Sequence, residues 1–273
     1  MLLLRIGDEG EPVAAIEQAL ADDGAVLAID GIFDQETENA VRVFQAAKSL
    51  HVDGIVGNDT IRAMGLDWPT LDPSGFRAEV VRIAGAEWRR WHPGGTKLVE
   101  TDPTMTSVLQ DYYATGIGEH VDAADLQDSD WQAEHFWSAV FISWVMRQAG
   151  AGSRFRYAAS HQRYIAAAKA NREAVDVNNP FWAFRLDELP PEVGDLVGAG
   201  RGNSGATYAN IAEGHFDCHV DIVTAVSGTD LTVIGGNVGQ SVGRTTVQTS
   251  HGFVDTTAPD QDEYFAVIRI QDF

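Results

Sequence analysis

The sequence is poor in cysteine, in basic residues and in long apolar runs, and each shortage excludes a class of protein. The one cysteine among 273 residues cannot form an internal disulfide or the cysteine cage of a structural zinc site. Lysine and arginine number 19 against 40 aspartates and glutamates, and the resulting net charge of −21 repels nucleic acids and anionic bilayers. No apolar run approaches the ~20 residues of a membrane span. We therefore expect neither a nucleic-acid-binding protein nor a membrane-spanning one.

The length and the apolar content indicate about two folded domains. With 44% hydrophobic residues, each domain can bury a core of its own. The first domain contains an internal repeat, because Ile29–Ile32 and Val52–Ile55 carry the same Asp-Gly-Ile pattern 23 residues apart. A threonine follows each copy at the same distance, at Thr37 and Thr60. Each copy predicts a tight turn at Asp-Gly followed by an N-capped helix.

Residues 1–66 predict a small all-α domain. A further helix is expected at Pro12–Leu20, where apolar residues recur on one face. In the motifs Asp30–Phe33 and Asp53–Gly57 and the helices beside them, this segment closely resembles the bacterial peptidoglycan-binding domain of the three-helix type. Asp34 departs from the family pattern, which usually has glycine there. The resemblance implies non-catalytic binding of cell-wall peptide or glycan.

Residues 67–75, rich in proline, aspartate and glycine, predict a linker to a second domain at 76–273. That domain begins with helical patterns and ends with strand patterns. The expected helices cover Phe76–Arg90, Met105–Tyr113, His135–Gln148 and Ser160–Arg172. The expected strands cover residues 195–197, Cys218–Ala225, 231–234, 245–247 and Tyr264–Ile270. Helices followed by antiparallel strands indicate an α+β domain with helices packed on a small sheet.

Three segments of this second domain carry residues suited to nucleophilic catalysis. Ser138 lies in the first turn of a predicted helix, where unpaired backbone N–H groups and the helix dipole favour negative charge. Strand alternation places His219 and Asp221 on one face, and the next strand ends at Asn237. A nucleophile at a helix N-terminus, facing a histidine and a polar orienting residue on adjacent strands, is the papain-like arrangement.

The motifs of the second domain are similar to those of the CHAP and NlpC-type cell-wall amidases and peptidases. The resemblance covers most of residues 76–273, and its motifs are Trp137–Val145, Gly194–Leu196, His219–Val223 and Gly235–Asn237. The chain looks like an uncharacterised bacterial branch with serine at the usual cysteine position. The resemblance implies a papain-like fold in which Ser138 is the nucleophile, His219 the base and Asn237 the residue that orients the imidazole. A serine forms its anion less readily than a cysteine, so an active hydrolase, another mechanism and an inactive site all stay open.

Other polar residues near these motifs have weaker assignments. Glu134 precedes Ser138 by four residues, which is expected to place it on the same helix face, and with Asp221 it could form the carboxylate pair that cleaves glycosidic bonds. His161, at the start of a helix, could line the cleft. Cys218 adjoins His219, but alternation points the two side chains apart, which favours a buried cysteine. The other histidines fit no metal-binding spacing, so we expect no metal and no cofactor.

The combined resemblances imply a peptidoglycan hydrolase that cuts amide bonds of the peptide stem and is held on the wall by its N-terminal module. Two alternatives remain open: a muramidase-type enzyme that uses Glu134 and a second carboxylate, and a catalytically inactive wall-binding protein. The expected partner is peptidoglycan.

The first residues carry no visible export signal. Met1–Arg5 is apolar but far shorter than the hydrophobic part of a secretory leader, and no small-residue cleavage site follows. Action in the periplasm or cell wall would then require a secretion machine or a phage holin, unless a leader has been removed. A phage endolysin and a delivered antibacterial effector both fit, and an effector would add an immunity or delivery protein as partner.

Overall fold

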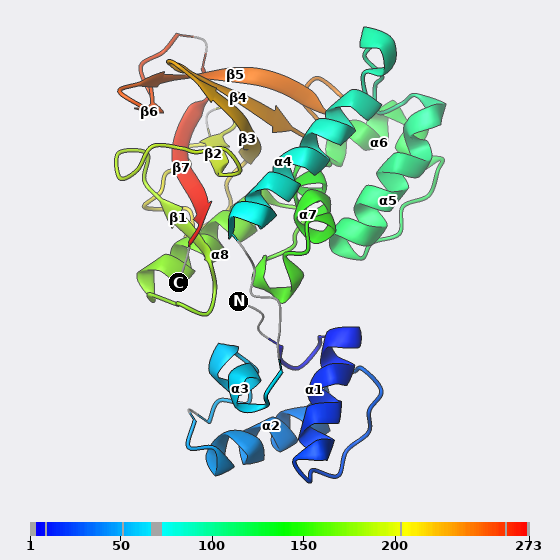
Figure 1. The fold of residues 1–273 in the computed structure, drawn as a ribbon. Coiled ribbons are helices and arrows are strands. Elements are labelled where there is room, and N and C mark those ends of the chain that lie inside the picture. Colours follow the sequence, from blue (N-terminus) through cyan, green and yellow to red (C-terminus); the bar gives the residue numbers. More distant parts are fainter. Residues whose placement is uncertain are drawn as a thin grey trace. The chain divides into compact units, whose positions relative to one another are not determined.

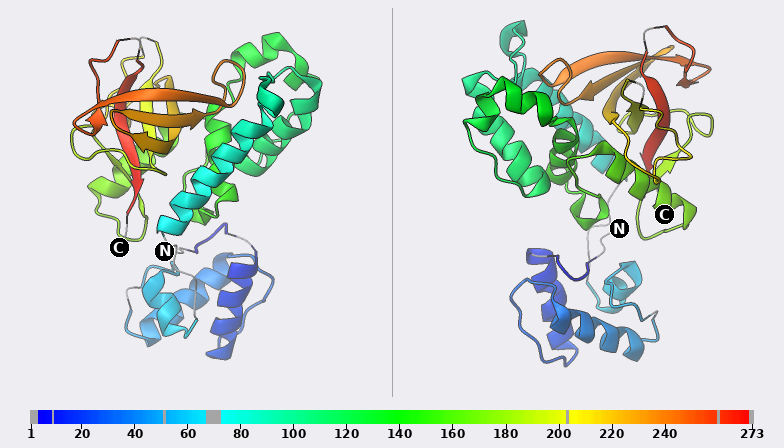
Figure 2. Two further views of the ribbon diagram at one scale, coloured as in Figure 1. Left: turned by 45° about the horizontal axis from the view of Figure 1, so that its top comes forward. Right: turned by 180° about the vertical axis from the view of Figure 1, so that it is seen from behind.

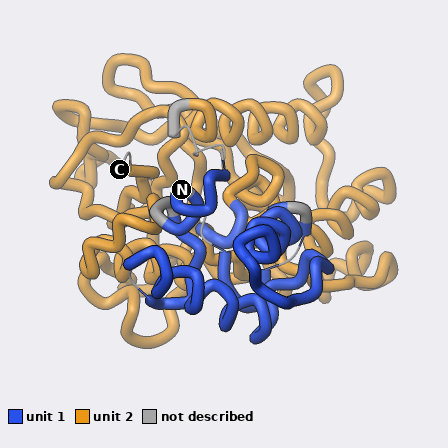
Figure 3. Tube along the Cα trace, turned by 60° about the horizontal axis from the view of Figure 1, so that its bottom comes forward, with its two compact units in different colours: residues 1–72, 152–154 blue, residues 73–151, 155–273 orange. Residues whose placement is uncertain are grey.

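The computed structural model describes residues 4–8, 10–50, 52–66, 73–202, 204–259 and 261–271. The chain divides into two compact units (Figure 3). Unit 1 comprises residues 1–72 with 152–154, and unit 2 comprises residues 73–151 with 155–273. Each unit is described by itself below.

The helices of unit 1 are α1 (Glu11–Asp22), α2 (Gln35–Ala47) and α3 (Asn58–Ala63), with a 3₁₀ turn at Gly152–Arg154 (Figure 1). Their apolar faces enclose one core, formed by Leu4, Val13, Ile16, Leu20, Phe33, Val41, Phe44, Val56 and Ile61. Asp34 begins α2, because its Oδ1 accepts hydrogen bonds from the backbone N–H groups of Glu36 at 2.8 Å and Thr37 at 3.0 Å. The aspartate that departs from the family pattern is thus the N-cap of this helix.

The two Asp-Gly turns of the repeat are each held by a buried side chain from the preceding helix. Gly31 and Gly54 adopt φ of 73° and 74°, a backbone conformation that favours glycine. Glu17 of α1 accepts a hydrogen bond from the N–H of Gly31 at 2.8 Å, and Gln45 of α2 accepts one from Gly54 at 2.9 Å. Glu17 also bonds Thr37 Oγ1, and Gln45 bonds the equivalent Thr60 Oγ1. The sequence repeat therefore encodes a repeated hydrogen-bond arrangement.

Unit 2 contains the helices α4 (Pro73–Arg90), α5 (Thr106–Ile117), α6 (Ser129–Glu134), α7 (Ser138–Gln148) and α8 (His161–Glu173). Short 3₁₀ turns cover Pro93–Gly95, Pro103–Met105 and Asp125–Gln127. Helix α7 is the central one, since every side chain from Ser138 to Met146 is buried. Helix α5 lies close against it at Gly116, where a Cβ atom would stand 3.0 Å from the carbonyl oxygen of Val140. Within the described residues, no helix is both long and apolar enough to cross a membrane.

The strands of unit 2 are β1 (Phe181–Phe184), β2 (Leu196–Gly200), β3 (Cys218–Ser227), β4 (Asp230–Gly235), β5 (Gly243–Ser250), β6 (Phe253–Val254) and β7 (Glu263–Ile270). In the described part of the chain they form one antiparallel sheet in the order β1-β7-β2-β3-β4-β5-β6. The sheet curls, and α4 to α7 gather beside it (Figure 2). This arrangement confirms the expected α+β domain.

The Gly194–Leu196 motif joins the helical layer to the sheet. Asp195 is buried and accepts hydrogen bonds from Arg77 of α4 at 2.8 Å and from Arg269 of β7 at 2.7 Å. The backbone of Gly194 lies so close to α4 that a Cβ atom would stand 2.5 Å from Arg77 Cβ. Gly194 and Asp195 therefore have a structural role.

Several predicted boundaries differ from the structure. The helix expected at His135–Gln148 begins only at Ser138, because His135 adopts φ of −122° and ψ of 76° and ends α6. Strands β1 and β6 and helix α6 were not expected from the pattern. Of the predicted linker, residues 67–72 lie outside the described residues, and 73–75 form the first turn of α4.

Candidate active site

Ser138 is the first residue of α7, and the residue before it fixes the start of that helix. Trp137 is fully buried, stacks on Trp91 with ring centroids 5.0 Å apart, and donates its indole N–H to Glu100 Oε2 at 2.6 Å. The backbone N–H of Phe141 donates to the Trp137 carbonyl at 2.9 Å and so begins the helical hydrogen bonds. The first N–H groups of α7 therefore have no partner within the helix, and the Ser138 hydroxyl lies among them.

The hydroxyl of Ser138 pairs with His161. Ser138 Oγ and His161 Nε2 are 2.7 Å apart, and both residues are buried. His161 is the first residue of α8, and its Nδ1 is hydrogen-bonded to the hydroxyl of Tyr164, one turn further along the same helix. Burial, and then the electrostatic influence of the neighbouring His219 and Arg201 side chains, hold the pKa of His161 well below its ordinary value. The imidazole is therefore neutral near pH 7, and one of its nitrogens has a free lone pair.

His219 makes a different set of hydrogen bonds. Its Nδ1 lies 2.9 Å from the guanidinium of Arg201, and its Nε2 lies 3.0 Å from Asp221 Oδ1. Because arginine can only donate, Nδ1 must be the acceptor, so Nε2 carries the proton and donates it to Asp221. Both nitrogens are then engaged, and the ring has no lone pair left for a serine. The two imidazoles are neighbours, with ring centroids 5.2 Å apart and edge-to-face packing.

The predicted pairing of Ser138 with His219 is therefore not the one that the structure contains. Sequence reasoning placed His161 at the cleft as an accessory residue. In the structure its Nε2 atom lies within hydrogen-bonding distance of Ser138 Oγ. Asp221 shares a strand face with His219, as alternation predicts, and its charge also acts on Tyr264 of β7. Burial and this carboxylate raise the pKa of Tyr264.

The glycines of the Gly235–Asn237 motif allow the end of β4 to lie close to His219 and Asp221. A Cβ atom on Gly235 would stand 2.0 Å from Asp221 Oδ1, and one on Gly236 would stand 2.4 Å from Phe141 Cβ. Asn237 follows with φ of 53° and is half-buried. Since Arg201 and Asp221 already occupy both nitrogens of the His219 ring, the predicted orienting role of Asn237 falls to those two residues instead.

The remaining candidates lie apart from Ser138 and the two histidines or carry a thiol that stays protonated near neutral pH. Glu134 is the exposed last residue of α6, so it does not share a helix face with Ser138 as expected. Cys218 is a buried free cysteine, as predicted, and burial together with the charge of Asp217 raises the pKa of its thiol to about 11. Among the described residues, no group of three histidine, cysteine or carboxylate side chains is arranged to hold a metal ion.

Sequence reasoning missed Tyr164 and Arg201. Tyr164 could have been found, because it lies three residues after His161 on one face of a predicted helix. Arg201 follows β2 in an irregular stretch, and its backbone N–H donates to the carbonyl of Asp217 at 2.8 Å. No periodic signal marks such a position.

Both parts of the chain match known families. Residues 9–64 match the family described as "Putative peptidoglycan binding domain", which confirms the predicted N-terminal domain. Residues 103–269 match the family described as "Uncharacterized protein conserved in bacteria (DUF2272)". A comparison with curated proteins gives no significant match. The relationship to CHAP and NlpC-type enzymes, and the place of Ser138 at their cysteine position, stay predictions.

Each of the solved structures with similarity to the chain is similar over a limited part of it. The SleB N-terminal domain is 31% identical, over 23% of this chain and 89% of its own, with a TM-score of 0.23. A fused Zn-dependent amidase/peptidase/peptidoglycan-binding protein from Clostridium acetobutylicum is 23% identical, over 31% and 44%, with a TM-score of 0.23. The Burkholderia AP3 phage endolysin is 24% identical, over 49% and 61%, with a TM-score of 0.23. The chain thus spans less than two thirds of the last two proteins.

Proposed function

Since the chain belongs to the bacterial family DUF2272 and carries a peptidoglycan-binding domain, we propose that it is a peptidoglycan hydrolase that cuts amide bonds of the peptide stem. The observation that carries the proposal is the 2.7 Å contact between Ser138 Oγ, at the N-terminus of α7, and Nε2 of a neutral His161. A nucleophile, a base and unpaired backbone donors are the three parts that acyl transfer requires. In this proposal the second domain is papain-like in the placement of its nucleophile.

The chemistry follows from these atoms. The proton of Ser138 passes to His161 Nε2 while Oγ forms a bond to the carbonyl carbon of the scissile amide. The oxyanion that develops is stabilised by the free N–H groups of the first turn of α7. The imidazolium then gives its proton to the leaving amine as the C–N bond breaks. Water, activated by the same imidazole, releases the acyl group from Oγ.

Tyr164 selects the productive form of His161. For Nε2 to accept the serine proton, Nδ1 must carry a proton and donate it to the Tyr164 oxygen. Burial and the nearby charge of Asp221 raise the pKa of Tyr164 well above its ordinary value, so the hydroxyl stays neutral and keeps oxygen lone pairs that can accept this bond. His219, held by Arg201 and Asp221, then serves as a fixed neighbour of the base.

The wall-binding domain supplies the substrate at high local concentration. Peptidoglycan is an insoluble polymer, and a module that stays bound to it converts encounter with the next bond into a near-intramolecular event. This arrangement explains why one chain carries both a wall-binding domain and a catalytic domain. We propose the periplasm or cell wall as the place of action.

Mass analysis of fragments released from purified sacculi tests the proposal. An amidase or peptidase generates new amino termini, whereas a muramidase generates new reducing ends and an inactive wall-binding protein releases nothing. We expect new amino termini, with Glu134→Gln acting like the wild type because this carboxylate lies exposed at the end of α6. New reducing ends that disappear in Glu134→Gln would transfer the chemistry to the carboxylates.

A further inference from the structure

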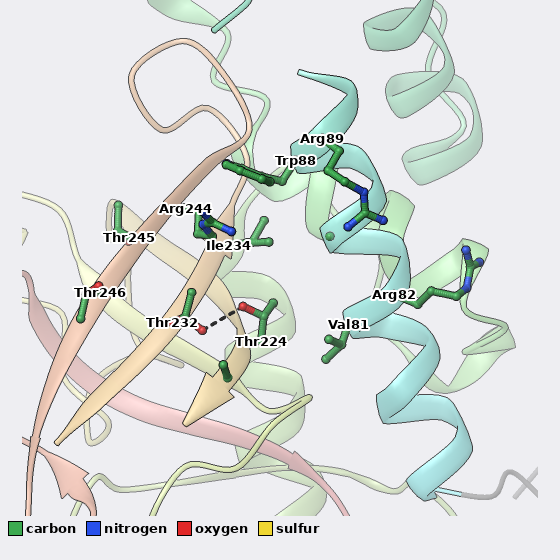
Figure 4. Close-up of a pocket in the computed structure, with 12 residues that line it drawn as sticks. Val81, Arg82, Trp88, Arg89, Thr224, Thr232, Ile234, Arg244, Thr245 and Thr246 are labelled. Atoms are coloured by element: carbon green, nitrogen blue, oxygen red, sulfur yellow. Dashed lines mark hydrogen bonds between the residues drawn. The ribbon is translucent and has the colours of Figure 1, made fainter. Parts of the chain in front are cut away.

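A pocket of about 680 Å³ lies between α4 and the sheet. It does not include the Ser138 cluster, by which we mean Ser138, His161 and His219. One wall consists of Arg82, Trp88 and Arg89 of α4, and the other consists of Thr232, Arg244 and Thr246 of β4 and β5 (Figure 4). The strand residues lie together because Thr232 pairs with Thr246 and Ile234 pairs with Arg244 in the ladder. The lining is thus rich in guanidinium and hydroxyl groups.

The pocket is on the opposite face of the sheet from His219 and Asp221. Ile234 lines the pocket and pairs with Ile222 of β3. Because adjacent residues of a strand point to opposite faces, Asp221 points away from the face that carries Ile222. A ligand in this pocket would therefore not touch the groups proposed for catalysis.

The arginines of the pocket differ in their partners. Arg82 is held by Glu79 through two short contacts of 2.7 and 2.6 Å and is thus neutralised. Arg244 lies over the ring of Trp88, 3.8 Å from its centroid, and the guanidinium of Arg89 lies over the backbone of Gly85, where a Cβ atom would stand 3.6 Å from its Nη1. Neither Arg89 nor Arg244 forms an ion pair with any carboxylate that the structure describes. Two uncompensated guanidinium groups in one cavity are unusual in a chain with a net charge of −21.

From this lining we infer a second binding site, whose ligand is a sugar or polyol that bears a phosphate or carboxylate group. The planar guanidinium groups of Arg89 and Arg244 match the oxygens of an oxyanion. Thr232 and Thr246 present hydroxyls suited to a hydroxylated carbon frame, and the Thr224 hydroxyl is fixed by donating to the Thr232 carbonyl at 3.0 Å. The apolar edge is supplied by Trp88, which Arg244 holds in place.

The negative charge of the whole chain does not prevent such binding. At physiological ionic strength, exposed charges further away than about 8 Å are largely screened. The ligand is therefore affected chiefly by the groups that line the pocket, and the guanidinium charges there exceed the carboxylate charges.

Calorimetric titration of the full chain with glucose 6-phosphate, D-glucuronate and uncharged glucose tests the site. We expect saturable binding of a charged sugar and none of glucose, and the sugar that binds identifies phosphate or carboxylate as the anion. Arg89→Gln and Arg244→Gln should each weaken binding by roughly tenfold, since each removes a charge-assisted hydrogen bond. Both residues are exposed, so the variants should fold, which circular dichroism checks.

The matched control is Arg90→Gln, which removes the same charge from the neighbouring residue. Arg90 contacts Glu87 at 3.6 Å and does not line the pocket. Its loss should leave binding unchanged. Binding of neither charged sugar, or equal weakening in all three variants, would overturn the assignment.

Discussion

At the scale of single residues, the two histidines beside Ser138 differ in what their ring nitrogens are free to do. His161 keeps a nitrogen at the serine hydroxyl, whereas His219 gives both nitrogens to Arg201 and Asp221. We expect His161→Gln to lower kcat/KM on soluble wall fragments by roughly 10²–10⁴-fold, the usual contribution of a general base. His219→Gln should cost less, because an amide can still accept from Arg201 and donate to Asp221. The opposite ranking in initial rates would restore His219 as the base.

The lowered pKa of His161 predicts the pH dependence of hydrolysis. The base acts only when it is neutral, and a histidine with an ordinary pKa is half protonated at about pH 6.5. Because burial holds the pKa of His161 below that value, kcat/KM should stay level as the pH falls through 6.5 and decline only at more acidic pH. The rate of soluble-fragment cleavage between pH 8 and about pH 5 measures this. A midpoint near 6.5 would assign the base to an unperturbed histidine.

The sequence predicted the place of Ser138 at the start of a helix better than the partner of its hydroxyl group. A serine before a strongly apolar helix is a local signal, and α7 begins at Ser138. The contact with His161 depends on how α8 packs beside α7, which no periodicity reveals. Likewise, the hydrogen bonds of His219 depend on Arg201, which lies in a stretch without regular structure.

At the scale of elements, Asp195 connects α4 and β7 through Arg77 and Arg269. We expect Asp195→Asn to lower the free energy of unfolding by roughly 3 kcal/mol, because it removes the buried carboxylate that both guanidinium groups share. Only the largely exposed Glu192, 3.2 Å from Arg77 and 3.3 Å from Arg269, then remains as their counter-charge. Urea unfolding measures this change. The matched control is Asp187→Asn, an exposed carboxylate 3.5 Å from Arg185, which should change stability by less than about 0.5 kcal/mol. Equal effects of the two substitutions would contradict the structural role.

The break between α6 and α7 shows where local pattern stops predicting elements. Residues 135–148 read as one helix, since no proline or glycine interrupts them. In the structure the His135 ring stacks on Trp131 at 4.0 Å and its Nδ1 meets the Trp131 carbonyl at 2.8 Å, which ends α6. The indole N–H of Trp137, at the start of α7, donates a hydrogen bond to Glu100. The local contacts of His135 and the distant contact of Trp137 with Glu100 thus override the helical pattern. The strands β3, β4 and β7, with strong apolar runs, were located to within two residues.

At the scale of the whole molecule, the proposed function assigns wall binding to unit 1 and hydrolysis to unit 2. Deletion of residues 1–72 should slow digestion of insoluble sacculi by more than tenfold, since the gain from tethering spans about 10²–10⁴. Cleavage of soluble wall fragments should stay within about twofold of the full chain, because the Ser138 cluster lies entirely in unit 2. Turbidity of sacculi and chromatography of soluble fragments provide the two rates. Equal losses on both substrates would show that unit 1 supports the fold of unit 2 instead.

The central claim is that the Ser138 hydroxyl is the nucleophile, and paired serine substitutions on α7 test it most directly. Ser143 is also buried on this helix, and its hydroxyl donates to the carbonyl of Ala158 at 3.0 Å, so Ser143→Ala removes the same atom from a structural position. The measurement is the initial rate of amino-terminus release from sacculi by the full chain. We expect Ser138→Ala to lose activity by roughly 10³-fold or more, while Ser143→Ala loses stability but retains turnover. Wild-type turnover by Ser138→Ala would contradict the assignment.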